Sequence, residues 1–183
     1  SLRIKEAIEA LQYTQNLSAK SLKSNVYSDV GVILPNFNDS YYVQMYQGIE
    51  SVFQSSGYYL NLAFSSDLPE LERSTAANML RKQVCGLILV TCQPEDWKFY
   101  YENFTRHDRA LVLVDRRIRN LDASFLALDT RVALCAMTRR LFQLGYRRPI
   151  LMAGYERYTC EAQCIRGFLD AFRREGLTPP PQA

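Results

Sequence analysis

The sequence predicts an α/β fold in which a parallel sheet is covered by helices on both faces. Short, near-continuous apolar segments alternate with longer amphipathic segments along most of the chain. This alternation is typical of buried parallel strands and their covering helices. Successive apolar segments begin roughly 25–30 residues apart, the length of a βαβ unit. A chain of 183 residues is long enough for one such domain and a little more.

The chain begins with a short, basic stretch that differs from the rest. Residues 1–11 have apolar side chains near a 3.6-residue period and are predicted to be helical. Asn16 is a good N-cap for a second helix, 17–24, which is too short to be stable in water without a packing partner. Residues 1–28 hold four basic and two acidic side chains, so they carry +2 of the net charge of +3.

From residue 29 onward, apolar runs and amphipathic stripes define the elements. The run 30–34 is continuously apolar and predicts the first strand; the stripe in 42–56 and Gly57 after it predict a helix with a glycine C-cap. Pro69 marks the start of the next helix. The predicted strands are 30–34, 58–64, 85–91, 110–114, 124–128 and 149–153. The predicted helices are 42–56, 69–83, 94–104, 131–144 and 159–175.

The last two helices are expected to bury one apolar stripe each. For 131–144 this stripe consists of Ala133, Met137, Leu141 and Leu144. For 159–175 it consists of Ala162, Ile165, Leu169 and Phe172.

Composition excludes several classes of protein. The longest apolar runs, such as 86–90 and 110–114, are far shorter than the roughly 20 residues of a spanning helix. No signal peptide is recognisable, so the sequence predicts no membrane association and a cytoplasmic location. Five cysteines at irregular spacing predict reduced, mostly buried thiols.

The residues needed for catalysis or metal binding are missing. His107 is the single histidine, and it lies in a polar turn with no paired nucleophile. Cys160 and Cys164 are four residues apart but have no nearby histidine to complete a zinc site. The first predicted strand ends in Pro-Asn-Phe-Asn-Asp, without the glycines of a nucleotide-binding loop. We therefore expect no catalytic residues, no metal and no cofactor.

Polar and aromatic side chains follow the first strand, where open α/β sheets bind ligands. Asn38 offers a donor and an acceptor, and Tyr41 and Tyr42 offer flat faces with polar tips suited to a sugar or a base. One of the two tyrosines is expected to pack in the core, since neighbouring helical residues point in different directions. Further polar residues end the next strands: Ser65, Ser66, Asp67, Thr91, Gln93, Asp115, Arg116 and Arg117.

The order of several segments resembles the lac repressor/galactose repressor family of bacterial transcription regulators. The resemblance runs through nearly the whole chain, and no single segment is diagnostic. The segments are RIKEAIEALQYTQNLSAKSLKSN, VGVILPNFNDSYYVQMYQGIE, SGYYLNLAFSSD, VCGLILV, LVLVDRR, LDTRVALCAMTRRLFQLGYRRPILMAG and CIRGFLDAF.

The resemblance implies a periplasmic-binding-protein-like (type I) fold with two lobes, the second incomplete. It assigns 1–12 to the last helix of a helix-turn-helix headpiece and 13–28 to a hinge helix and linker. It assigns 29–127 to the N-terminal lobe and 128–183 to the start of the C-terminal lobe. The chain is then expected to act as a homodimeric repressor controlled by a small effector, most simply a sugar.

In the family the hinge helix enters the minor groove of operator DNA, and an apolar wedge there bends the duplex. Leu22 matches that wedge, and Lys20 and Lys23 would lie near phosphates. Ser18 and Ala19 belong to the same implied DNA-binding segment.

The resemblance also implies effector contacts from Tyr41, Tyr42, Asp115, Tyr158 and Cys160. Cys164 occupies a position where many members have an arginine that grips the effector, and a thiol cannot replace its charged hydrogen bonds. A carboxylated or phosphorylated effector is therefore less expected, unless Arg116 or Arg157 substitutes.

Two alternatives remain open at this point. A solute-binding protein of a transport system would share the two-lobed fold, but it would have no use for the Leu/Lys segment before the first strand. An α/β enzyme is disfavoured by the lack of a base, a nucleophile or a phosphate-binding loop.

Overall fold

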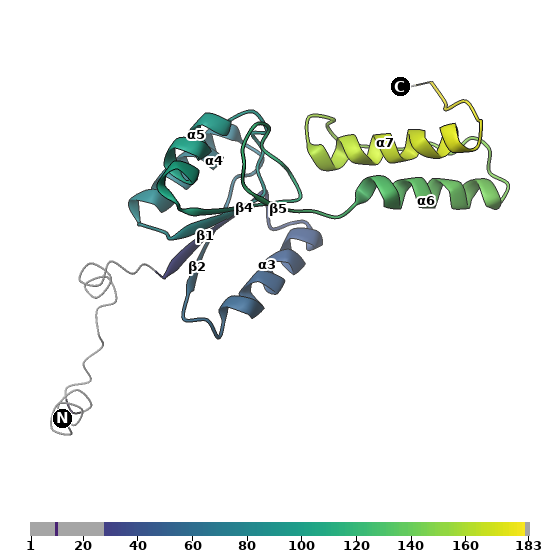
Figure 1. Cartoon of the computed structure of the whole chain (residues 1–183). Helices are drawn as coiled ribbons and strands as arrows, with labels where there is room; N and C mark the ends of the chain where they lie inside the picture. Colours follow the sequence, from purple (N-terminus) through teal and green to yellow (C-terminus); the bar gives the residue numbers. More distant parts are fainter. Residues whose placement is uncertain (1–9, 11–27, 182–183) are drawn as a thin grey trace.

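The computed structural model describes residue 10 and residues 28–181. Within this part, five parallel strands form one sheet in the order β2-β1-β3-β4-β5 (Figure 1). Their bounds are Asp29–Leu34 (β1), Tyr59–Phe64 (β2), Gly86–Leu89 (β3), Ala110–Val114 (β4) and Ser124–Leu126 (β5). The five predicted strands up to residue 128 and their parallel pairing are thus confirmed.

The helices lie on both faces of this sheet, as predicted. Helices α4 (Pro69–Arg81) and α5 (Trp97–Asn103) cover one face, and α3 (Ser40–Phe53) covers the other (Figure 1). A short 3₁₀ helix, Thr105–His107, follows α5. We call residues 28–126 the α/β unit.

Two apolar cores hold the α/β unit together, one on each face of the sheet. Ile33 of β1 packs with Met79 of α4 and Tyr100 of α5 on one face. Val32 and Leu34 pack with Tyr42 of α3 on the other. Alternate side chains of one strand therefore serve opposite cores, which explains why strand β1 is continuously apolar.

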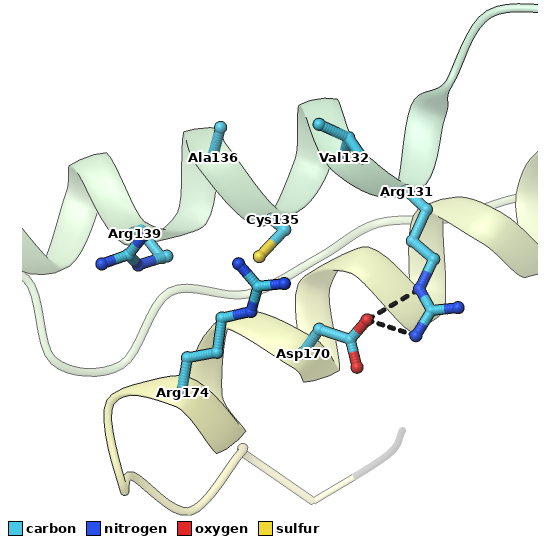
Figure 2. Close-up of a pocket in the computed structure, with 7 residues that line it drawn as sticks. All are labelled: Arg131, Val132, Cys135, Ala136, Arg139, Asp170 and Arg174. Carbon is cyan, nitrogen blue, oxygen red and sulfur yellow. Dashed lines mark hydrogen bonds and ion pairs between the residues drawn. The ribbon is translucent and has the colours of Figure 1, made fainter.

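Helices α6 (Thr130–Gln143) and α7 (Thr159–Arg174) form a second body beside the sheet (Figure 1), which we call the helical pair. Their shared core contains Cys135 and Phe142 from α6 and Phe168, Ala171 and Phe172 from α7. At the interface between α6 and α7, the Nε–H of Arg131 donates a hydrogen bond to Asp170 Oδ2, over 2.7 Å (Figure 2).

The structure corrects two predictions for this region. Residues 149–153 do not form a strand; Ile150 and Met152 are 81% and 95% exposed. The physical reason is that no strand among the described residues lies beside this segment to take up its backbone hydrogen bonds.

The predicted inward stripe of 131–144 was also wrong. Met137 and Leu144 are exposed, whereas Cys135, Thr138 and Phe142 are the buried residues of α6. Helix α6 has two apolar faces, and α7 packs against the less apolar of the two. In the part of the chain that the structure describes, every helix is too short or too polar to span a lipid bilayer.

Candidate functional site

The candidate site lies at the carboxyl ends of the strands, where the chain reverses its winding direction. From β1 the chain passes through α3 to β2 on one face, then through α4 to β3 on the opposite face. Loops on either side of β1 thus diverge and leave a crevice, the position at which open α/β sheets bind ligands.

The loop between β1 and α3 is held by its own polar side chains. Asn36 Oδ1 accepts hydrogen bonds from the backbone N–H groups of Asn38 and Asp39, over 3.0 and 3.1 Å. Asp39 caps α3 by accepting from the Tyr41 N–H, over 2.9 Å. These bonds fix the angle at which α3 starts and therefore where its two tyrosines point.

Tyr41 and Tyr42 have different environments, as predicted for neighbouring helical residues. Tyr42 is buried and its hydroxyl accepts from Arg116 Nη2, over 3.2 Å. Burial raises the pKa of Tyr42 to about 12. Tyr41 is 38% exposed and donates to Asp115 Oδ1, over 3.4 Å. Burial, followed by the nearby Asp115 charge, raises the pKa of Tyr41.

Arg116 is the buried centre of the site. Its Nη1 donates to Asp67 Oδ1, over 2.5 Å, and to the Thr91 carbonyl oxygen, over 3.4 Å. Burial alone would lower the pKa of this guanidinium, but the hydrogen bond to Asp67 and the adjacent Tyr42 raise it above its usual value. Arg116 is thus permanently charged and joins the loops after β2, β3 and β4.

Asp115 and Cys160 face each other beside Arg116. Burial raises the pKa of Asp115, although Arg116 and hydrogen bonds from the Cys160 thiol and Tyr41 oppose the shift. Burial, followed by the Asp115 charge, raises the pKa of Cys160 to about 11. At neutral pH the Cys160 thiol is therefore protonated.

The helical pair contributes the start of α7 to the site. The buried Tyr158 ring lies against the Arg116 guanidinium, with 3.9 Å between the Cζ atom and the ring centroid. Its hydroxyl accepts from Arg157 Nη2, over 2.7 Å. The Thr159 hydroxyl accepts from the backbone N–H of Arg117, over 3.0 Å. The site is therefore built from two separate bodies.

A buried carboxylate behind the site was not predicted from the sequence. Glu72 of α4 is fully buried and accepts from the hydroxyls of Thr91 and Tyr100, over 2.8 and 2.7 Å, and from the Cys92 N–H. It fixes the loop after β3, whose Thr91 carbonyl contacts Arg116. No sequence signal separates Glu72 from the neighbouring Glu70 in the first turn of α4.

The structure brings six of the eight predicted effector-site residues together: Tyr41, Tyr42, Asp115, Arg116, Tyr158 and Cys160. Asn38 is exposed and Cys164 is partly buried. Among the described residues, neither side chain makes a hydrogen bond to this group. The predicted hinge residues Ser18, Ala19, Lys20, Leu22 and Lys23 lie outside the described residues.

Cavities lie on both bodies. One of about 490 Å³ adjoins the carboxyl edge of the sheet and is lined in part by Cys92, Gln93 and Arg157. A groove of about 210 Å³ lies between α6 and α7, away from the site (Figure 2). Residues 28–181 contain no group of three or more histidine, cysteine or acidic side chains that could hold a metal.

Comparisons with known proteins agree with this architecture. Residues 27–182 match a family model described as periplasmic binding proteins and sugar binding domain of LacI family. Catabolite control protein A of Staphylococcus aureus (strain Mu50 / ATCC 700699) is 25% identical over 176 residues, which are 96% of this chain and 53% of that protein.

The HTH-type transcriptional regulator GalR of Escherichia coli (strain K12) is 22% identical, over 96% of this chain and 51% of its own length. This chain therefore spans about half the length of the curated relatives it matches. The crystal structure of the Cra transcriptional dual regulator of Pseudomonas putida with fructose 1-phosphate has a TM-score of 0.77 at 22% identity. The match covers 84% of this chain and 57% of that one.

Proposed function

We propose that this chain, which belongs to the LacI/GalR family, carries the effector-binding cleft of a sequence-specific DNA-binding repressor. A small effector, most simply a sugar, binds the cleft and changes the affinity of the regulator for its operator. The observation that carries this proposal is the site itself. Tyr41, Asp115 and Arg116 of the α/β unit meet Tyr158 and Cys160 of the helical pair at the carboxyl edge of the sheet.

The chemistry of the site favours a neutral, hydroxyl-rich effector. The Asp115 carboxylate is an acceptor for sugar hydroxyls, and Tyr41 presents a partly exposed ring that a sugar can pack against. Arg116 is already occupied by Asp67, Thr91 and Tyr42. Position 164 holds a thiol, so a sugar phosphate would need Arg157, which lines the neighbouring cavity.

We assign the parts of the chain accordingly. Residues 29–127 form the N-terminal lobe of the effector-binding domain and 128–183 the start of its C-terminal lobe. Residues 1–12 are the last helix of a helix-turn-helix headpiece, and 13–28 are a hinge helix and linker. The support is the agreement of the α/β unit and the helical pair with these boundaries, and the family resemblance of the N-terminal segment.

In this assignment the hinge carries part of the DNA contact. Leu22 is the apolar wedge, Lys20 and Lys23 neutralise phosphates, and Ser18 and Ala19 belong to the same minor-groove segment. The regulator binds operator DNA as a homodimer. The exposed apolar residues Val52, Tyr58 and Tyr59 on one side of the α/β unit support the proposal that this side is the dimer surface.

A transport protein with the same fold is the alternative, and the similar catabolite control protein A and GalR favour a regulator. The proposed role is binding without turnover, in the cytoplasm and away from any membrane.

Two measurements on the intact protein test the proposal. A thermal-shift screen of neutral sugars, sugar phosphates and nucleobases should find a compound that raises the apparent stability, because a ligand of the native state must do so. Selection of bound sequences from a pool of random DNA duplexes should yield a preferred DNA sequence. The compound found in the thermal-shift screen should then change the affinity of the protein for that sequence at fixed salt. A protein that shows no sequence preference with or without the hit contradicts the proposal.

A further inference from the structure

The groove between α6 and α7 is rich in arginine side chains (Figure 2). It has a volume of about 210 Å³ and lies on the helical pair, away from the proposed effector cleft. Its lining consists of Arg131, Val132, Cys135, Ala136 and Arg139 from α6 and Asp170 and Arg174 from α7. Three guanidinium groups from two helices therefore share this space with one carboxylate.

The two carboxylates at the groove are already paired with arginines. Asp170 accepts from Arg131 Nε with Oδ2 and from Arg173 Nη1 with Oδ1, each over 2.7 Å. Glu175 Oε1 accepts from Arg139 Nε, over 2.9 Å. This bond uses only the Nε of Arg139, so its two terminal nitrogens make no hydrogen bond with a described residue.

Arg174 carries the clearest excess of positive charge. Its side chain extends from α7 into the groove (Figure 2), and it forms no hydrogen bond or ion pair within the part of the chain that the structure describes. The helix dipole favours arginines in the last turn of α7, but Arg173 already supplies one there. The charged side chains at the groove give a net charge of +2: Arg131, Arg139, Arg173, Arg174, Asp170 and Glu175.

The size and chemistry of the groove suit one small anionic group. Its volume is below the roughly 300–1,000 Å³ of pockets for drug-sized ligands. Guanidinium groups bind phosphate and carboxylate oxygens with two parallel hydrogen bonds. The unused donors of Arg139 and Arg174 lie on opposite walls, one on each helix. A phosphate monoester has three terminal oxygens and can bond both arginines at once, whereas a carboxylate has two.

We propose that the groove between α6 and α7 binds a phosphate group, held between Arg139 of one helix and Arg174 of the other. The ligand is inorganic phosphate or a small phosphate monoester, whose carbon atoms would pack against Val132 and Ala136 on the groove wall. This site goes beyond the proposed function, because it lies on the helical pair alone and its ligand is not the effector. A bound phosphate connects α6 to α7 and stabilises the helical pair.

A titration of the intact protein with sodium phosphate tests the site, with sodium chloride keeping the ionic strength constant. We expect saturable shifts of the Ala136, Arg139 and Arg174 amide signals in ¹H–¹⁵N NMR spectra. The dissociation constant should be on the order of 1 mM, since a few charge-assisted hydrogen bonds supply the binding energy. The Arg117 amide, at the proposed cleft, should not shift.

Substitutions of Arg174 separate a phosphate site from general charge screening. Arg174→Gln should weaken phosphate binding about tenfold or more, because charge-assisted hydrogen bonds are lost. Arg174→Lys should fall in between, since it keeps the charge but not the planar fork. Arg166→Gln is the matched control: it removes the same charge from an exposed position of the same helix outside the groove, and it should bind phosphate as the wild type does.

A second variant changes the groove without removing an arginine. Ala136→Glu places a negative charge on the groove wall and uses a good helix former, so it should abolish binding at unchanged far-UV circular dichroism. Glycerol 3-phosphate, compared with glycerol and with inorganic phosphate, distinguishes the sources of the phosphate group. Binding several-fold tighter than inorganic phosphate identifies a phosphorylated metabolite as the ligand, and equal binding identifies free phosphate.

The phosphate site is disproved if sodium chloride alone produces the same shifts, or if Arg174→Gln and Arg166→Gln bind phosphate equally well. These measurements use neither the effector nor DNA. Their failure would therefore leave the proposed regulatory function standing, and a failed DNA-binding test would leave the phosphate site standing.

Discussion

Gly167 of α7 lies directly against the backbone carbonyl of Arg131 in α6. A Cβ atom at position 167 would overlap that carbonyl oxygen, so the two helices can cross this closely only because the residue is glycine. This close approach of α6 and α7 also allows the Arg131 side chain to bond the Asp170 carboxylate on the facing helix (Figure 2).

Gly167→Ala should therefore destabilise the helical pair, although alanine is the better helix former. Forcing the backbones apart costs about 1–3 kcal/mol, the range for overpacking a well-packed contact. Gly48→Ala in α3 is the matched control, since a Cβ there meets nothing within 4 Å, and it should be neutral or stabilising by up to about 1 kcal/mol. Urea unfolding of both variants measures the difference; equal midpoints would contradict the close crossing.

Glu72→Gln should also destabilise the protein. The Cys92 N–H can only donate, so a glutamine must turn its carbonyl oxygen to it and its NH₂ group to the Thr91 and Tyr100 hydroxyls, which then accept instead of donating. The expected loss is about 1–3 kcal/mol, because both buried hydroxyl protons lose their acceptor. Glu70→Gln, two residues earlier and exposed, should change unfolding by less than about 0.5 kcal/mol. The interpretation fails if both variants unfold alike.

The thiol of Cys160 should react slowly at neutral pH. With a pKa of about 11, about one molecule in a thousand carries the thiolate at pH 8. Asp115→Asn removes a negative charge that raises this pKa, so alkylation of Cys160 by iodoacetamide should become faster and its pH profile should move to lower pH.

Cys85 is an internal control for that experiment. Burial and Asp29 raise its pKa, and Asp115 does not, so its alkylation rate should be the same in both proteins. Peptide mass spectrometry follows the two sites in one sample. If the pH profile of Cys160 alkylation is the same in Asp115→Asn as in the wild type, this result would contradict the proximity of Asp115 and Cys160.

Asp115 should make stability depend on pH in an unusual direction. Its folded pKa is raised above the unfolded value, so the folded state binds the proton more tightly. Its contribution to stability is therefore favourable at low pH and is lost as pH rises through the folded pKa. Asparagine stays uncharged, so Asp115→Asn should be more stable than the wild type near neutral pH. This difference in the free energy of unfolding should shrink toward pH 4. A constant difference across this range would argue against a raised pKa.

The sequence was sufficient for the α/β unit because its signals are local. Apolar runs such as 30–34 are buried on both faces, and polar residues after each strand must meet at one edge of a parallel sheet. Tyr41, Asp115 and Arg116 could be grouped on that basis alone.

The remaining features depend on contacts between distant residues. Glu72 has the same sequence surroundings as the exposed Glu70, and only the approach of Thr91 and Tyr100 gives it a role. The buried side of α6 could not be predicted because that helix has two apolar faces. The richer one, with Met137 and Leu144, is not the one that α7 covers.

The loop between β1 and α3 has a consequence for how such sequences can vary. Two consecutive tyrosines of α3 form hydrogen bonds with two consecutive residues after β4. Tyr41 donates to Asp115, and Tyr42 accepts from Arg116. Inserting one residue before α3 would turn the helix by about 100° and exchange or abolish both pairings. Substituting an exposed side chain of this loop, such as Asn38, should therefore leave both pairings intact, whereas changing the length of the loop should not.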